Sequence, residues 1–463
     1  MHHLRVLFAL ALLAGLAPAQ FQFGVVCTTD NPFATSPNSS HRLGATDELV
    51  GGATNTVHFV YSSHQAAWIR TGTFRGSLSW DAPVLIDADG VSPAIDCRPD
   101  GHRYVVWSRG DSIGHPRVCF QDLDTAMPPV LLTEVNDNSV TPDVYCDDSG
   151  RAHIVWQEEK YGADSTDIMY RSWYGGVLSS PVVISSEPGY EQNDCPSISC
   201  FEGGDIYVTW RAYDSALASP WSIKRRRLIG GQWQPVELVW HSARELKAPS
   251  LDFGRGGEPL GVCWADSTAG GFDPHYLGGN GGGYSTHWEA GSPVVSNLGN
   301  TWSYLFWQDD SGGDSDIRTH FYYFMTGWDA GYSIRQFFGI TENIWSPTCL
   351  GALVLWLQGE PNNCRVMYAY FDYPIGIAES PRQKSSRRLS VQPNPVRAHA
   401  RVTARGPVSV FDRSGRLVAG PFVIRNGLRP CGNSASFDID LGSLPSGVYL
   451  VRSGAESATV VKQ

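Results

Sequence analysis

The sequence contains few charged residues. Asp, Glu, Lys and Arg make up 17% of its 463 residues, below the roughly 25% usual in soluble domains. The 35 basic residues are fewer than the 46 acidic ones, and 35 − 46 gives a formal net charge of −11. Nucleic acids and anionic membrane surfaces are bound through clustered Lys and Arg, so we expect no nucleic-acid partner.

Metal-binding signatures and long apolar runs are also missing. The ten cysteines include no CxxC pair, and no cluster of Cys and His has the spacing of a zinc site. Beyond the N-terminus, no stretch reaches the roughly 18 apolar residues that a membrane-spanning helix needs. We therefore expect no transmembrane segment and no cofactor or metal site, with Ca²⁺ on loop carboxylates as the alternative.

The N-terminus has the three parts of an export signal. Residues 1–5 are short and basic, residues 6–16 are apolar but too few to span a bilayer, and residues 17–19 form a small-residue cleavage site. We therefore predict a signal peptide over residues 1–19 and a mature chain that starts at Gln20. The protein is expected to be exported, either released outside the cell or attached to the outer cell surface.

Aromatic and turn-forming residues are abundant. Aromatics make up 12% of the chain, which has 16 Trp, 49 Gly and 29 Pro. Low charge, many Trp and Tyr and many turn formers are typical of an all-β protein built from short strands. A chain of this length exceeds one ordinary domain, so we expect a repeat array or more than one domain.

One unit of about fifty residues recurs along the chain: a strand led by Pro, a turn, and a second strand that ends in an aromatic residue. The aromatic marks of the successive units are Tyr61, Trp107, Trp156, Trp210, Trp264, Trp307 and Trp356. Consecutive marks lie 43 to 54 residues apart; for example, 307 − 264 is 43 and 210 − 156 is 54. Such spacing of short strands is typical of a β-propeller with four strands in each blade.

Seven marks predict a seven-bladed β-propeller over residues 20–378, with six or eight blades as alternatives because the unit at 245–292 is irregular. Residues 22–27 have the pattern of an outer strand without a blade of their own. We expect this strand to complete the last blade, because closure removes an exposed sheet edge. Cys27 would then lie beside the strand that contains Cys364, and we predict a disulfide between these two cysteines.

The C-terminal part differs in composition and pattern. Residues 379–388 are rich in Ser and basic side chains and are predicted to be an exposed linker. Short strands with turn signals follow over 389–463, which predicts a small Ig-like β-sandwich. Its motifs are Val-Gln-Pro-Asn-Pro at 391–395, a strand and turn at 408–418, Leu-Pro-Ser-Gly-Val-Tyr at 444–449 and a final strand at 459–463.

These motifs, in this order, resemble the C-terminal sorting domain of the type IX (Por) secretion system. The residues that carry the resemblance are Pro393, Asn394, Pro395, Gly415, Gly447, Tyr449 and Lys462. The resemblance implies a sorting tag that is recognised by an outer-membrane secretion machinery, which would be the partner of this domain. The alternative is a sandwich that binds carbohydrate or acts as a spacer.

The polar segments that follow the second strands supply the candidate site residues. In a propeller these segments converge on one face, and they contain Glu158, Arg211, Asp266 and Asp309. We expect them to bind a ligand, either a carbohydrate or a protein partner. The alternatives are an extracellular glycoside hydrolase or lyase that uses these carboxylates as acid, base or nucleophile, and solvated turn residues without a function.

Comparison with sialidases does not decide whether this protein is an enzyme. The N-terminal region resembles exported bacterial β-propellers, among which sialidases are the natural comparison. However, the sialidase repeat Ser-x-Asp-x-Gly-x-x-Trp is absent from the sequence. No catalytic residue is therefore assigned from the sequence.

Overall fold

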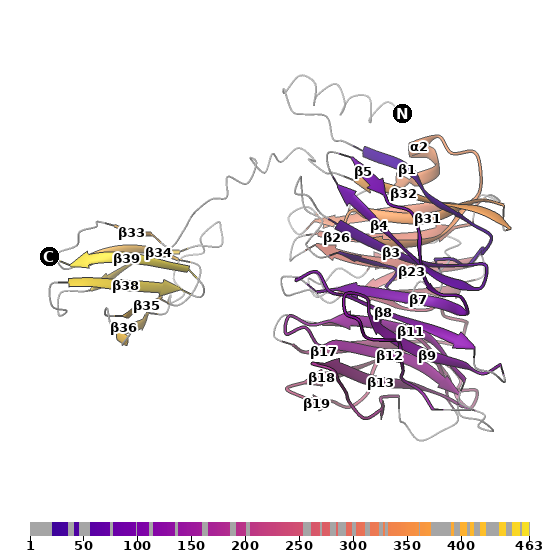
Figure 1. Cartoon of the computed structure of the whole chain (residues 1–463), viewed down its shortest axis with the longest axis horizontal. Coiled ribbons are helices and arrows are strands. Elements are labelled where there is room, and N and C mark those ends of the chain that lie inside the picture. The colour runs from indigo at the N-terminus through magenta and orange to yellow at the C-terminus, as the bar shows by residue number, and fades with distance from the viewer. Residues whose placement is uncertain are drawn as a thin grey trace. The chain divides into compact units, whose positions relative to one another are not determined.

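The computed structural model divides into two compact units, Ala19–Tyr373 and a unit that contains Pro374–Gln463, and each is described by itself (Figure 1). The predicted signal peptide at 1–19 and the predicted linker at 379–388 lie outside the described residues. The structure describes residues 21–35, 41–45, 56–74, 77–98, 100–110, 114–134, 138–159, 165–185, 191–200, 204–252, 261–268, 271–277, 284–285, 293–298, 302–310, 315–323, 327–328, 332–360, 362–371, 390–392, 399–404, 408–411, 417–422, 435–440, 447–453 and 456–462.

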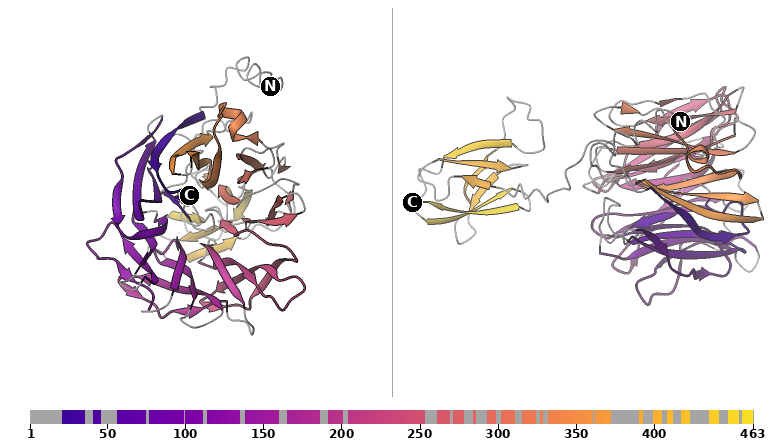
Figure 2. Two further views of the ribbon diagram at one scale, coloured as in Figure 1. Left: turned by 90° about the vertical axis from the view of Figure 1, so that its right-hand side faces the viewer. Right: turned by 90° about the horizontal axis from the view of Figure 1, so that it is seen from above.

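The first unit is a β-propeller, and its described strands form antiparallel groups around a central axis, which we number blades 1 to 7 (Figure 2, left). Blade 1 contains β2 (Leu43–Ala45), β3 (Thr56–Ser63), β4 (Ala66–Phe74), β5 (Leu78–Trp80) and β6 (Val84–Asp87). Blade 2 contains β7 (Gly90–Cys97), β8 (Arg103–Gly110), β9 (Pro116–Asp122) and β10 (Val130–Leu131). Blade 3 contains β11 (Asn138–Cys146), β12 (Ala152–Glu159), β13 (Thr166–Tyr174), β14 (Val177–Leu178) and β15 (Val182–Val183).

The remaining blades follow the same order. Blade 4 contains β16 (Gln192–Cys200), β17 (Ile206–Tyr213), β18 (Trp221–Ile229), β19 (Gln232–Trp233) and β20 (Glu237–Ser242). Blade 5 contains β21 (Ser250–Asp252), β22 (Gly261–Thr268), β23 (Gly271–Leu277) and β24 (Tyr284–Ser285). Blade 6 contains β25 (Val294–Leu298), β26 (Trp302–Asp309), β27 (Asp316–Tyr323), β28 (Gly327–Trp328) and β29 (Tyr332–Ser333), followed by helix α2 (Ile334–Phe338). Blade 7 contains β30 (Ile344–Leu350), β31 (Leu353–Glu360), β32 (Asn363–Phe371) and β1 (Phe21–Thr29).

Strand β1 closes the ring, as the sequence predicted. It pairs antiparallel with β32, from Phe21 opposite Phe371 to Thr29 opposite Cys364. The outer strand of blade 7 therefore comes from the start of the chain, whereas its inner strands come from the end of the propeller.

The predicted disulfide between Cys27 and Cys364 is wrong. A register shift between Val25 and Cys27 places Cys27 opposite Val366, while Cys364 lies opposite Thr29, and the structure contains no disulfide between them. Burial raises the pKa of the Cys27 thiol to about 12, against smaller opposing contributions from Tyr61 and Arg70. Cys27 is therefore a partly buried free thiol in the closing blade.

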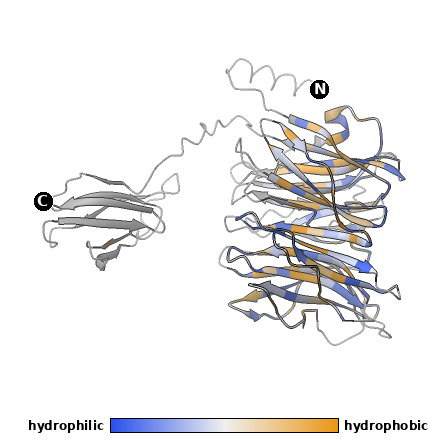
Figure 3. Cartoon of the chain, viewed as in Figure 1, coloured by the Kyte–Doolittle hydropathy of each residue, from blue (hydrophilic) through white to orange (hydrophobic). Residues whose placement is uncertain are grey.

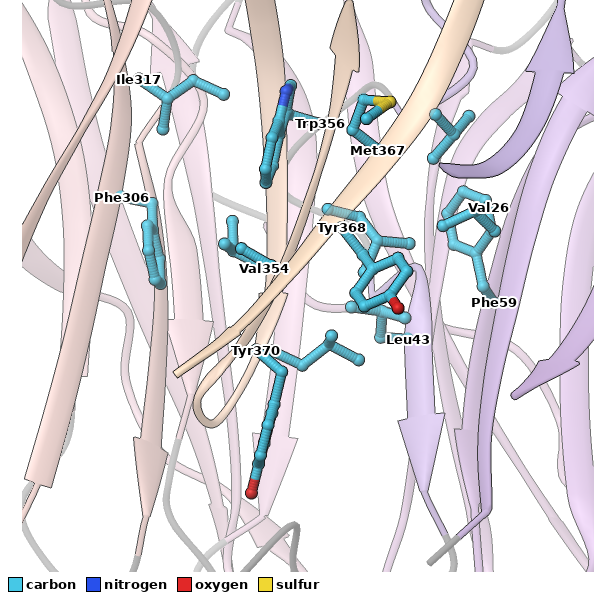
Figure 4. Packing of buried hydrophobic residues seen from close by; sticks show 14 of the residues in the cluster. Val26, Leu43, Phe59, Phe306, Ile317, Val354, Trp356, Met367, Tyr368 and Tyr370 are labelled. Carbon is cyan, nitrogen blue, oxygen red and sulfur yellow. The ribbon is translucent and has the colours of Figure 1, made fainter. Parts of the chain in front are cut away.

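The aromatic marks are core residues. Trp107, Trp156, Trp210, Trp307 and Trp356 are all fully buried. Figure 4 shows Trp356 of blade 7 packed in the same cluster as Phe306 of blade 6 and Phe59 of blade 1. Figure 3 shows hydrophobic and hydrophilic positions interspersed along the propeller strands, as expected when side chains of one strand alternate between two environments. The aromatic residue that marks each repeat in the sequence is thus a core side chain of its blade.

The prolines of the repeat lie at bulges inside the first strands. The residues that precede them, Ser92, Thr141, Cys195 and Ser346, have positive φ angles of 51°, 49°, 51° and 51°. At each of these sites the pairing between the first and second strands shifts register. Because a bulge leaves one residue unpaired, it accepts a proline that has no backbone N–H to donate. The first strands therefore begin three or four residues before the proline rather than at it.

Polar side chains of the innermost strands connect blades 2 to 7 in succession. In each case a backbone N–H of one blade donates a hydrogen bond to a side-chain oxygen of the preceding blade. The donors and acceptors are Cys146 to Asp96 (2.7 Å), Ile198 to Asp143 (3.0 Å), Leu251 to Ser197 (3.1 Å), Val295 to Ser250 (3.5 Å) and Gly351 to Ser296 (2.7 Å). Each bond satisfies a backbone donor that has no other strand on that side. These bonds form a belt around the axis.

His41, just before β2, joins this belt from blade 1 to blade 3. Its backbone N–H donates to Asp143 at 2.8 Å, its Nδ1 lies 3.0 Å from both carboxylate oxygens of Asp143, and its carbonyl accepts from Ile95 at 2.8 Å. Asp143 is fully buried. Burial opposes the imidazolium, but the charge and hydrogen bonds of Asp143 outweigh it and raise the pKa of His41 to about 9. The pair is therefore a buried ion pair at neutral pH.

The C-terminal unit contains two antiparallel sheets. One consists of β33 (Ser390–Gln392), β34 (His399–Ala404) and β37 (Ala435–Asp440), and the other has the order β36 (Leu417–Phe422), β35 (Val408–Phe411), β38 (Gly447–Ser453) and β39 (Glu456–Lys462). Among the sorting-motif residues, Gly447 pairs with Lys462 and Tyr449 with Val460. Pro393, Asn394, Pro395 and Gly415 lie outside the described residues. The described helical segment is too short and too polar to cross a membrane.

Candidate functional site

The four predicted site residues all lie towards the ends of second strands, but their partners differ. Glu158 is on β12, Arg211 on β17, Asp266 on β22 and Asp309 on β26. Three of the four are held by contacts that stabilise the blades. The fourth, Asp266, holds an exposed aromatic ring.

Glu158 supports the core of blade 3. Its carboxylate accepts a hydrogen bond from the indole Nε1 of Trp156 at 3.0 Å and lies 3.4 Å from the hydroxyl of Ser139. The side chain is almost fully buried. Its role is to satisfy a buried indole N–H, which would otherwise lack an acceptor.

Arg211 and Asp309 form ion pairs within their blades. Arg211 Nε donates to Asp194 at 2.7 Å, and Arg318 Nε donates to Asp309 at 2.7 Å. Burial lowers the pKa of Arg211, but Asp194 outweighs burial and the net shift is upward. These pairs orient the ends of the second strands.

Asp266 contacts the outer strand of blade 4. It accepts hydrogen bonds from Trp240 Nε1 at 3.1 Å and from the hydroxyl of Ser242 at 2.8 Å. Trp240 lies on β20 and retains 38% exposure, although large aromatic side chains are usually well buried. The carboxylate therefore fixes the orientation of an indole that solvent can reach.

Two further rings pack beside Trp240. Its ring centroid lies 5.8 Å from that of Trp264 and 5.3 Å from that of His275. Trp264 and His275 are stacked with centroids 5.5 Å apart and planes 9° apart, as expected for residues directly opposite each other on β22 and β23. In the same hairpin, Asp273 lies directly opposite Asp266. We call Trp240, Trp264, Asp266, Asp273 and His275 the aromatic patch.

The indole N–H groups of the marks differ from blade to blade in whether they find an acceptor. Trp107 donates to Asp87 at 2.8 Å, Trp156 to Glu158 at 3.0 Å and Trp210 to Asn193 at 2.8 Å. The buried Nε1 atoms of Trp264, Trp307 and Trp356 have no hydrogen-bond partner among the residues that the structure describes. Asp266 occupies the position that Glu158 has in blade 3, but it binds Trp240 instead. The carboxylate of blade 5 thus serves the surface rather than the core.

The segment that links blades 4 and 5 brings Arg211 close to the aromatic patch. Arg211 Nη1 donates to the carbonyl of Leu246 at 2.8 Å, and Leu246 forms a β-bridge with Asp266. Lys247 lies above the ring of Phe272, 4.1 Å from its centroid. Arg211 and Asp266 are therefore neighbours, whereas Glu158 belongs to blade 3 and Asp309 to blade 6.

Sequence reasoning missed three residues of the aromatic patch: Trp240, Asp273 and His275. Trp240 falls on an outer strand, where the repeat has no mark. Asp273 and His275 are two residues apart on β23, which is the spacing that places side chains on one face of a strand. That spacing was a usable signal, but the glycine-rich irregularity of this unit hid the hairpin. Asp273 is almost fully buried.

The described residues include no group of three or more His, Cys, Asp and Glu side chains arranged to hold a metal ion. The calcium alternative is not tested by this observation, because many of the connecting segments lie outside the described part of the chain. It stays a prediction.

No protein-family model and no curated protein matches the chain. Solved structures do resemble it. They include an ulvan lyase of polysaccharide lyase family PL25 (10% identity, TM-score 0.47, 77% of this chain and 96% of that one), the α-L-arabinanase of Penicillium chrysogenum (10%, 0.42, 76% and 98%) and the β-propeller domain of the trilobed protease of Pyrococcus furiosus (11%, 0.43, 72% and 94%). At these identities the likeness concerns the fold alone.

Proposed function

We propose that this is an exported protein whose propeller binds carbohydrate at the aromatic patch. The observation that carries the proposal is Trp240, an exposed indole whose orientation is fixed by Asp266 and by packing on Trp264 and His275. The C–H face of a sugar ring stacks on an indole, and its hydroxyl groups bond to carboxylates. Ligand sites commonly combine aromatic side chains with a few oriented polar groups in this way.

Delivery to the cell exterior is the second part of the proposal. The signal peptide at 1–19 would direct export, and the C-terminal unit would act as the tag for an outer-membrane secretion machinery. What supports this is the order of the motifs that end in Gly447, Tyr449 and Lys462. Deleting residues 389–463 should then leave the propeller inside the producing cell, as measured by fractionation.

Binding can be tested with the mature chain from Gln20. We expect retention of the protein by at least one of three immobilised polymers: dextran, polygalacturonate or dextran sulfate. Trp240→Ala should reduce the affinity at least tenfold, whereas Tyr174→Ala, which removes an exposed ring from blade 3, should leave it unchanged. Equal losses in both variants, or binding that is unaffected by Trp240→Ala, would contradict this site.

A glycoside hydrolase or lyase is the second candidate, and one observation favours it. Asp266 and Asp273 are directly opposite on an antiparallel pair, where Cβ atoms lie about 4.5–5.5 Å apart. Retaining glycosidases use two neighbouring carboxyl groups, one as nucleophile and one as acid and base. An enzyme should release new chain ends from the bound polymer and lose this activity in Asp273→Asn while still binding it. A pure binding site should release none.

A further inference from the structure

His275 packs against two indoles and lies near two carboxylates. Its ring centroid is 5.3 Å from that of Trp240 and 5.5 Å from that of Trp264. Asp273 is two residues earlier on the same face of β23, and Asp266 is opposite Asp273. A titratable ring is thus built into the packing that fixes Trp240.

The other charged groups near His275 come from neighbouring elements. Asp266 comes from β22 and Asp273 from β23, and both favour the imidazolium. On β20, Glu237 is paired with Arg225. In the linking segment, Glu245 is paired with Lys247. His241 and Arg244 are exposed, whereas Cys263 on β22 and Tyr276 on β23 are buried and uncharged at neutral pH.

The two protonation states of His275 have different preferred neighbours. A neutral imidazole stacks as a flat aromatic ring and leaves Asp266 bonded to Trp240. An imidazolium is a cation beside two indole rings and is attracted to both carboxylates. Competition for Asp266 then weakens its hydrogen bond to Trp240 Nε1, which fixes the exposed ring.

We propose that His275 makes ligand binding at the aromatic patch proton-dependent, with the neutral imidazole supporting the bound state and the imidazolium releasing the ligand by withdrawing Asp266 from Trp240. This inference rests on the proposed function, because it concerns the regulation of the same site. It assigns to His275 a positioning role that acts through Trp240.

The direction of the effect follows from burial. Burial lowers the pKa of His275 below its ordinary value, against the opposing effect of Asp266 and Asp273. The imidazole is therefore neutral at pH 7 and takes up a proton on the acidic side of its ordinary range. A ligand that covers Trp240 buries the imidazole further and favours the neutral form. Affinity should thus fall on acidification, by at most tenfold for each pH unit below that pKa.

The proton uptake can be measured without any ligand. Trp fluorescence of the mature chain is followed from pH 7.5 to 4.5, because an imidazolium beside an indole quenches its emission. His320 also stacks on an indole, that of Trp307 at 5.3 Å, so the signal of His275 is the difference between the wild-type curve and that of each variant. This difference should be a one-proton transition for both His275→Gln and His275→Phe, of which the second keeps a stacked ring, and should be absent for His241→Gln, a matched control on the exposed part of β20. Curves of both His275 variants that coincide with the wild-type curve would overturn the inference.

The coupling to binding is measured with dextran, polygalacturonate and dextran sulfate at pH 7.5 and 4.5. We expect the polymer that binds at pH 7.5 to bind at least fivefold more weakly at pH 4.5, and this difference to vanish in His275→Phe. Equal affinity at the two pH values would overturn the coupling alone. Absence of binding at every pH would contradict the proposed function and remove the coupling with it, while the ligand-free transition would still report proton uptake by His275.

Discussion

The role of a carboxylate in this propeller depends on its partner rather than on its place in the repeat. Glu158 and Asp266 both lie two residues after a Trp mark and towards the end of a second strand. Glu158 accepts from the Trp of its own blade, whereas Asp266 accepts from Trp240 of the preceding blade. The repeat predicted both as candidate site residues. It could not separate them, because the deciding partner comes from another blade.

Substitution should distinguish the structural role of Glu158 from the binding role of Asp266. Glu158→Ala leaves the indole N–H of Trp156 buried without its acceptor, so we expect the free energy of unfolding to fall by about 1–3 kcal/mol. Asp266→Ala should cost less stability, since Trp240 can donate to water, but should weaken polymer binding. Urea unfolding and the binding assay measure the two effects. A larger loss of stability in Asp266→Ala would contradict these assignments.

At the scale of the element, the closing strand was predictable and its register was not. Residues 22–27 have the alternation of an outer strand and no blade of their own, which was enough to place β1 in blade 7. The predicted disulfide failed because Cys27 lies opposite Val366 and Cys364 opposite Thr29. The register before the bulge, in which Val25 lies opposite Met367, would place Cys27 opposite Arg365. The register of a closing strand depends on tertiary geometry that a single sequence does not reveal.

The packing of the closing strand β1 on β32 predicts the effect of a substitution at Gly24. A Cβ atom added there would lie 2.9 Å from Cε1 of the Tyr368 ring on β32. Gly24→Ala should therefore lower the free energy of unfolding of the propeller by about 1–3 kcal/mol through overpacking. Gly110→Ala is the matched control, because a Cβ atom there meets nothing within 4 Å. Equal stability of the two variants in urea would show that β1 does not pack as described.

For the whole molecule, composition and repeat length predicted an all-β chain, a β-propeller and a separate C-terminal segment. The belt around the axis could not be predicted in the same way. His41 and Asp143 are 102 residues apart, and their contact exists only because the blades close into a ring. The aromatic patch likewise joins an outer strand of blade 4 to the central hairpin of blade 5. Both are products of the tertiary arrangement.

The ion pair at the axis makes the stability of the propeller depend on pH. The pKa of His41 is raised from 6.5 to about 9, so its contribution is fully present below about pH 6.5 and is lost as the pH rises through about 9. We expect the free energy of unfolding to fall by about 3 kcal/mol over this range. His41→Gln should be less stable at pH 6 and should lack this fall. A wild-type protein that unfolds at the same urea concentration at pH 6 and pH 10 would contradict the account.

The claim that ligand contacts Trp240 can be observed at the ring itself. In the mature chain labelled with 5-fluorotryptophan, the ¹⁹F resonance of Trp240 is assigned by its loss in Trp240→Phe. On saturation with the polymer that binds, this resonance should shift, whereas that of the buried Trp156, assigned in the same way, should not. A Trp240 resonance that stays unchanged at saturation would show that the ligand binds elsewhere, and the aromatic patch would not be the binding site.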